Sequence, residues 1–133
     1  MIEFILSFIT AYSTLKLHGS NRASSVFASS LVTIISFLVL LVINLVVDFD
    51  INHFMFFIFG ASFVGMCSKE KGNFYQLLLY SFLYTVFLFN FSKYLTGIGG
   101  ALGLSAFLSV YLGYHFTELI SKIASTPKWS ERK

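Results

Sequence analysis

Residues 26–47 restrict the fold more than any other part of the chain, because no charged side chain interrupts them. As an α-helix this run would be about 33 Å long, and the hydrocarbon core of a bilayer is about 30 Å thick. Residues 51–67, 74–91 and 95–120 form three further apolar runs between short polar connections. This pattern predicts an all-α membrane protein, a multi-pass bundle of transmembrane helices with short loops.

The composition agrees with a bilayer environment. The chain of 133 residues is 56% hydrophobic and only 11% charged, whereas soluble domains have about 25% charged residues. Its one proline is Pro127, and no linker-like stretch precedes it, so residues 1–133 are expected to form a single domain. Cys67 is the only cysteine, which excludes an intramolecular disulfide. The net charge is +3, but the basic residues lie between and after the apolar runs, so this charge does not predict nucleic-acid binding.

The first apolar segment, residues 2–17, differs from the others because a polar stripe runs down it. The stripe consists of Glu3, Ser7, Thr10 and Thr14, whose spacing puts them on one face of a helix. A helix of this length measures about 24 Å, a little short of the bilayer core. The segment either spans the membrane or lies at its interface, so the sequence predicts four or five spans.

Basic residues predict how the chain is oriented. With the N-terminus outside, every Lys and Arg except Lys93 falls on the cytoplasmic side, and residues 121–133 form a basic cytoplasmic tail. Short cytoplasmic loops of membrane proteins carry such an excess of positive charge. We therefore expect a cytoplasmic C-terminus, with the protein in the plasma (inner) membrane. An interfacial first segment would leave this distribution unchanged.

Small side chains predict where helices approach each other closely. Residues 95–120 contain a groove of such side chains, matched by a shorter face in residues 51–67. Small residues at four-residue spacing let helix backbones come together in membranes. The groove residues are Gly99, Ala101, Gly103, Ser105, Ser109 and Gly113, and the facing residues are Ala61 and Gly65. The glycines at 97–100 also predict a break at the start of the last helix.

Chemically reactive side chains are sparse in the predicted spans. Catalysis at membrane depth needs acids, bases, nucleophiles or metal ligands, and no charged side chain or histidine lies in the middle of a confident span, so no enzyme and no cofactor are expected. His115 and Glu118 are weak candidates for part of a metal site, since a spacing of three puts them on one helix face. Asp48, Asp50 and His53 are interpreted as a solvated acidic loop.

The function expected from this pattern is that of a small noncatalytic integral membrane protein, a subunit of a homo- or hetero-oligomeric membrane assembly. Its partners would be the lipid bilayer and either copies of itself or other membrane proteins. The alternative is a small oligomeric channel or passive transporter for ions or small solutes. In that case the stripe from Glu3 to Thr14 would line the path.

Overall fold

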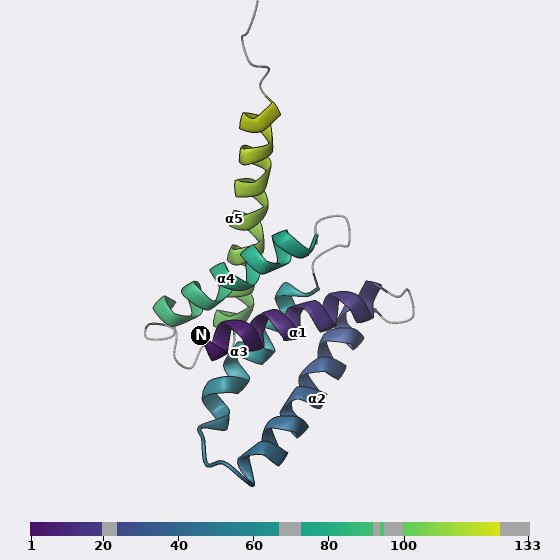
Figure 1. Ribbon diagram of the computed structural model, residues 1–133, viewed down its shortest axis with the longest axis vertical. Helices are drawn as coiled ribbons and strands as arrows, with labels where there is room; N and C mark the ends of the chain where they lie inside the picture. The colour runs from purple at the N-terminus through teal and green to yellow at the C-terminus, as the bar shows by residue number, and fades with distance from the viewer. Residues whose placement is uncertain (20–23, 67–72, 92–93, 95–99, 126–133) are drawn as a thin grey trace, which may run out of the picture.

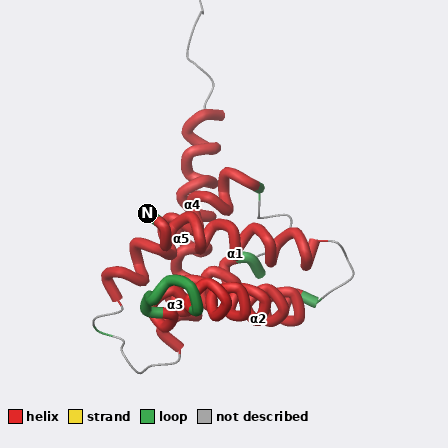
Figure 2. Tube along the Cα trace, turned by 60° about the horizontal axis from the view of Figure 1, so that its bottom comes forward, coloured by secondary structure: helices red, strands yellow, loops and turns green. Residues whose placement is uncertain are grey.

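The computed structural model describes residues 1–19, 24–66, 73–91, 94 and 100–125. These residues form five α-helices and no strand, as Figure 2 shows. The helices are α1 (Ile2–Gly19), α2 (Ser25–Asn44), α3 (Ile51–Val64), α4 (Phe74–Phe91) and α5 (Gly100–Ser125). The all-helical fold class is thus confirmed. Cys67, Gly99 and the predicted break at 97–100 lie outside or at the edge of the described residues.

Two helices begin at side chains that cap them. Ser24 precedes α2, and its Oγ accepts a hydrogen bond from the Phe27 N–H at 3.3 Å. Asp50 precedes α3, and its Oδ1 accepts from the N–H groups of Asn52 at 3.0 Å and His53 at 3.4 Å. Such caps satisfy backbone donors that have no partner within the helix. They therefore fix where α2 and α3 begin.

The first four helices alternate in direction. At one end of this group, Glu3 of α1 lies near His53 of α3, and Phe57 of α3 contacts the ring of Phe89 in α4. At the other end, Tyr12 of α1 contacts Phe74, the first residue of α4. Helices α1 and α3 therefore run in the same direction, with α2 and α4 running opposite to them, as Figure 1 allows the reader to follow.

Helix α5 packs against α4 and α3, and then continues beyond both. Figure 1 shows its C-terminal half standing clear of the other helices, on the side away from the α2–α3 hairpin. The helix runs from Gly100 to Ser125, so it extends into the segment that the sequence assigns to the tail. Residues 126–133 lie outside the described part of the chain.

The interior combines aromatic and small apolar side chains with many hydroxyl groups. A cluster of buried apolar residues packs where α1, α3, α4 and α5 meet; its members are Ala11, Phe57, Ala61, Val64, Leu77, Tyr80, Tyr84, Leu88 and Ala106. Buried with them are the serines and threonines Ser7, Thr10, Thr14, Ser29, Ser62, Ser81, Thr85, Ser105 and Ser109. The large aliphatic and aromatic side chains of α2 mostly lie on the outside. By length and composition, α2 and α4 are the described helices that could cross a membrane.

Candidate functional site

The polar stripe of α1 faces the interior of the protein. Ser7, Thr10 and Thr14 are buried, whereas Ile5 and Ile9 on the opposite face are exposed. The Thr10 hydroxyl donates to the Leu6 carbonyl at 2.8 Å, and the Thr14 hydroxyl donates to the Thr10 carbonyl at 2.9 Å. A hydroxyl that bonds to the preceding turn of its own helix no longer needs water. The stripe can therefore be buried as a row of short side chains.

Gly65, the C-cap of α3, lies against this part of α1. A Cβ added at Gly65 would lie 2.7 Å from Thr14 Cβ and would collide with the Ala11 carbonyl oxygen. Only a residue without a side chain allows the two backbones to approach this closely. Gly65 thus contacts α1, while Ala61, one turn earlier on α3, is also buried.

Two hydroxyl groups in this interior have no partner among the described atoms. Ser7 Oγ on α1 and Ser81 Oγ on α4 are both buried without a hydrogen bond, and their helices pack against each other. The Thr85 hydroxyl one turn later donates to the Ser81 carbonyl at 2.9 Å. The buried faces of α1 and α4 therefore each contain one serine hydroxyl without a described hydrogen-bond partner.

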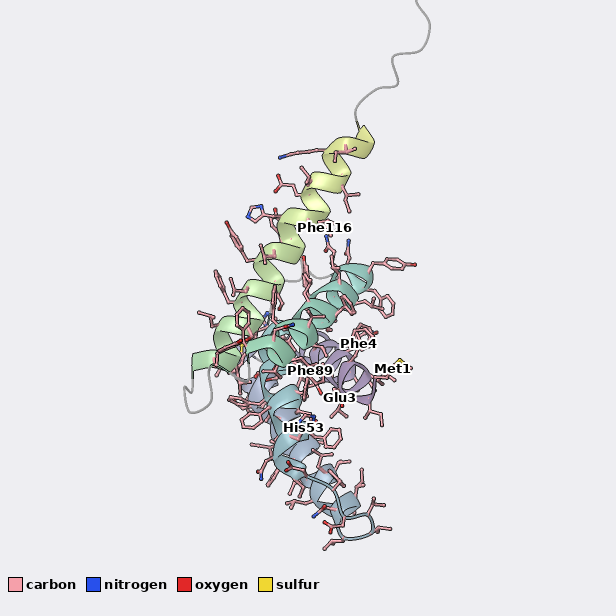
Figure 3. The ribbon with its side chains drawn as sticks, turned by 90° about the vertical axis from the view of Figure 1, so that its left-hand side faces the viewer. Met1, Glu3, Phe4, His53, Phe89 and Phe116 are labelled. Atoms are coloured by element: carbon pink, nitrogen blue, oxygen red, sulfur yellow. The ribbon has the colours of Figure 1, made fainter. Side chains whose placement is uncertain are left out.

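Glu3, the first member of the stripe, lies at the surface and meets a side chain that the sequence pattern assigned to a separate loop. Its Oε1 is 3.9 Å from His53 Nε2, and its Oε2 is 3.0 Å from the Met1 nitrogen. Figure 3 shows Glu3 and His53 near each other at the start of α1 and α3. The orientation predicted from basic residues puts Glu3 and His53 on the same side of the membrane. This shared side is the one feature of the sequence that could have suggested the pair.

The opposite end of α1 carries an aromatic cluster and a cation. Tyr12 contacts the rings of Phe8 and Phe74, and Lys16 Nζ lies 5.7 Å from the centre of the Tyr12 ring. An ammonium group over an aromatic face is attracted by the quadrupole of the ring. Lys16 therefore places a positive charge at this end of α1, whereas at the other end the Glu3 carboxylate pairs with the Met1 amino group.

The small-residue groove of α5 is divided between packed and open positions. Ser105 and Ser109 are buried, with hydroxyls that donate to Ala101 at 2.8 Å and Ala106 at 2.7 Å. A Cβ added at Gly113 would collide with the Tyr80 ring of α4 and would lie 3.4 Å from Leu83 Cδ1.

Gly103 and Ala101 complete the described part of this groove. Gly103 is different from Gly113, because a Cβ added there would have no described heavy atom within 4 Å. Ala101 is half-buried, and Gly99 lies outside the described residues.

Side-chain hydrogen bonds join the remaining helices in ways that residue spacing did not indicate. Ser29 Oγ of α2 and Ser62 Oγ of α3 are 2.8 Å apart in the interior. The Tyr84 hydroxyl of α4 donates to the Phe56 carbonyl of α3 at 2.9 Å and lies directly over Gly60. Asn44, the last residue of α2, makes no such bond between helices through its Oδ1, which accepts from the Phe49 N–H at 3.1 Å in the following loop.

The candidates for a metal site lie on the exposed part of α5. His115 Nδ1 is 3.8 Å from Glu118 Oε2, and Lys122 Nζ is 2.8 Å from Glu118 Oε1. The Glu118 carboxylate, as hydrogen-bond acceptor and as negative charge, raises the pKa of Lys122. Within the described residues, no three His, Cys, Asp or Glu side chains come together as metal ligands. The Glu118 carboxylate instead forms an ion pair with Lys122, one turn later on α5.

Among the described residues, the arrangement offers helix contacts and two carboxylate–imidazole pairs, Glu3–His53 and Glu118–His115. Its hydroxyl groups mostly donate to the carbonyls of their own helices. Comparison with known proteins adds no analogy, because no protein-family model, no curated protein and no solved structure matches this chain.

Proposed function

We propose that this chain is a noncatalytic, multi-pass integral membrane protein that acts as a subunit of a homo- or hetero-oligomeric membrane assembly. The observation that carries the membrane part of the proposal is the distribution of side chains between interior and surface. Nine serines and threonines are buried among the described residues, while large aliphatic side chains cover α2, including Ile34, which is 60% exposed. In water this distribution would leave far more apolar surface than a soluble monomer exposes. In a bilayer, short side chains belong at helix contacts and long apolar ones face lipid.

The alternating directions of α1–α4 support spans of alternating orientation. Glu3, His53 and Phe89 mark one end of this group, and Tyr12, Lys16 and Phe74 mark the other. The loops predicted to be cytoplasmic connect helices at the second end, and these loops carry the basic residues. Because α1 lies alongside α3, it would cross the same depth of membrane. We therefore favour five spans with the C-terminus in the cytoplasm.

Two observations favour assembly over an independent channel. The stripe of α1 is buried against neighbouring helices, and its threonine hydroxyls bond within α1, so they are not directed at a water-filled path. Gly103 and Gly100 on α5 have no described neighbour in the space that a Cβ would occupy. An unfilled position of this kind on an apolar helix lets a second helix approach closely.

Cell fractionation followed by purification in mild detergent tests both parts of the proposal. The chain should sediment with membranes, resist extraction at alkaline pH and dissolve in detergent. It should then elute as a complex larger than one chain, alone or with another membrane protein. Recovery in the soluble fraction would contradict the membrane location. A monomer that conducts ions selectively in reconstituted vesicles would instead support the channel.

A further inference from the structure

Glu3 and His53 join the first turns of two helices that are distant in sequence. Glu3 Oε1 and His53 Nε2 are 3.9 Å apart, within the range of an ion pair when the imidazole is protonated. The carboxylate belongs to α1 and the imidazole to α3, and these two helices pack against each other. A change of charge on one side chain therefore acts directly on the contact between α1 and α3.

The pair is accessible to solvent protons yet connected to the interior. The His53 side chain is 45% exposed and that of Glu3 is 22% exposed. The His53 ring contacts Phe57, and Phe57 contacts Phe89 of α4; Figure 3 shows Phe89 close to the pair. The imidazole therefore sits between solvent and the aromatic contact that joins α3 to α4.

Among the described residues, two further charged groups contact members of the pair. Asp50 belongs to the same helix start, where its Oδ1 accepts from the His53 backbone N–H at 3.4 Å. The Met1 nitrogen is 3.0 Å from the other Glu3 oxygen. Helices α2 and α4 contribute no charged side chain, because their sequences contain none. Among these groups, imidazole is the side-chain type whose charge normally changes between pH 5 and 8.

We propose that Glu3 and His53 form a pH-responsive contact that holds the start of α1 against the start of α3 when His53 is protonated. Protonation converts a carboxylate facing a neutral ring into a pair of opposite charges, which favours the closed contact. Deprotonation removes this attraction and leaves the first turn of α1 held by its apolar neighbours. The Glu3–His53 contact would respond to pH whether or not the proposed function is correct. The proposed orientation in the membrane adds only that the pH in question is the pH outside the cell.

Amide hydrogen exchange in detergent micelles at pH 6 and pH 8, corrected for intrinsic exchange rates, tests this proposal. For the amides of residues 5–10, protection should be about two- to fivefold greater at pH 6, as expected for a partly exposed ion pair. Glu3→Gln and His53→Gln should each abolish the difference. His53→Lys, which keeps a positive charge at both pH values, should give high protection at both. These variants separate a charge effect from a merely structural role of the ring.

His115→Gln is the matched control, because His115 also lies 3.8 Å from a glutamate but on the exposed part of α5. It should leave the pH difference in residues 5–10 unchanged. An N-terminal extension, which removes the Met1 amino group from the pair, should leave the difference in place as well. Equal protection at both pH values in the original chain would overturn the proposal, as would a difference that persists in His53→Gln. Either result would leave the membrane location untouched, since fractionation tests that separately.

Discussion

Helices α1 and α2 have nearly the same length, 18 and 20 residues, but they differ in how much of their surface other helices cover. Helix α1 buries its hydroxyl side chains and exposes isoleucines, and it packs against α2, α3 and α4. Helix α2 buries only Ala28, Ser29 and Leu40 and exposes most of its aliphatic residues. In both helices, small or hydroxyl side chains mark the protein contacts and large apolar ones mark the outside.

This comparison teaches that hydrophobicity alone does not identify the contact faces of this protein. In a soluble helix the apolar stripe faces the core, whereas the most polar stripe of α1 does so here. The reason is that hydroxyls bonded to their own backbone are short and impose little desolvation cost. Backbones can then approach as closely as α1 and Gly65 do. The following substitutions would break or sharpen this contrast between inner and outer faces.

The largest effect is expected from a charge placed at the centre of the exposed face of α2. Ile34→Lys should destabilise membrane insertion by about 2.5–3.5 kcal/mol, because an ammonium group at the middle of a bilayer is costly. The fraction of chains inserted into microsomal membranes measures this. Leu45→Lys is the depth control, since Leu45 is 88% exposed just beyond α2 and lies near the predicted interface.

If α2 were instead exposed to water, both lysine variants would fold alike. Surface substitutions in water usually change stability by less than about 0.5 kcal/mol. Equal behaviour of Ile34→Lys and Leu45→Lys would therefore remove the outer face of α2 as evidence for lipid contact.

The next largest effect is expected at the closest contact of the inner face. Gly65→Ala should lower the free energy of unfolding in detergent by about 1–3 kcal/mol, because the new methyl group meets the Ala11 carbonyl and Thr14 Cβ. The backbone at Gly65 is itself helical, with φ −69° and ψ −14°, so the loss would come from packing.

Gly103→Ala is the matched glycine control on α5. A Cβ there meets no described atom within 4 Å, and alanine is favoured over glycine within helices by up to about 1 kcal/mol. It should therefore leave the unfolding free energy of the isolated chain unchanged or raise it. Equal losses at Gly65 and Gly103 would contradict the assignment of inner and outer positions.

The sequence was sufficient to predict that five segments of the chain are helical. Apolar runs determine where helices form, and the residues Ser24 and Asp50 determine where two of them begin. The sequence was not sufficient to predict which small face meets which helix. Gly65 was expected to lie opposite the groove of α5, and its close neighbours are instead Ala11 and Thr14 of α1.

Which helix packs against a given helix face depends on the tertiary arrangement, and the spacing of residues along the sequence does not determine that arrangement. Four-residue spacing shows that Gly113 lies on a face with small residues, but the ring that fills the space beside it belongs to Tyr80, a large residue on α4. The pairing of Glu3 with His53 likewise depends on α1 and α3 running in the same direction. Residue spacing within one helix carries no information about either relation.

The smallest effect is expected where the exposed helix touches the interior, at Ser29. Its Oγ is 2.8 Å from Ser62 Oγ, and this is a hydrogen bond between α2 and α3. Ser29→Ala should lower the unfolding free energy in detergent by about 0.5–1.5 kcal/mol. The loss is limited because the Ser62 hydroxyl still donates to the Phe59 carbonyl at 2.7 Å.

Ser30→Ala, at the adjacent position, separates this hydrogen bond from the general effect of removing a serine hydroxyl. Ser30 is exposed, and its hydroxyl bonds only within α2, to the Val26 carbonyl at 2.9 Å. We expect its stability change to stay below about 0.5 kcal/mol. If the two variants lost equal stability, the hydrogen bond from Ser29 to α3 would contribute no more than the bond that Ser30 makes within α2. The distinction between the inner and outer faces of α2 would then not hold.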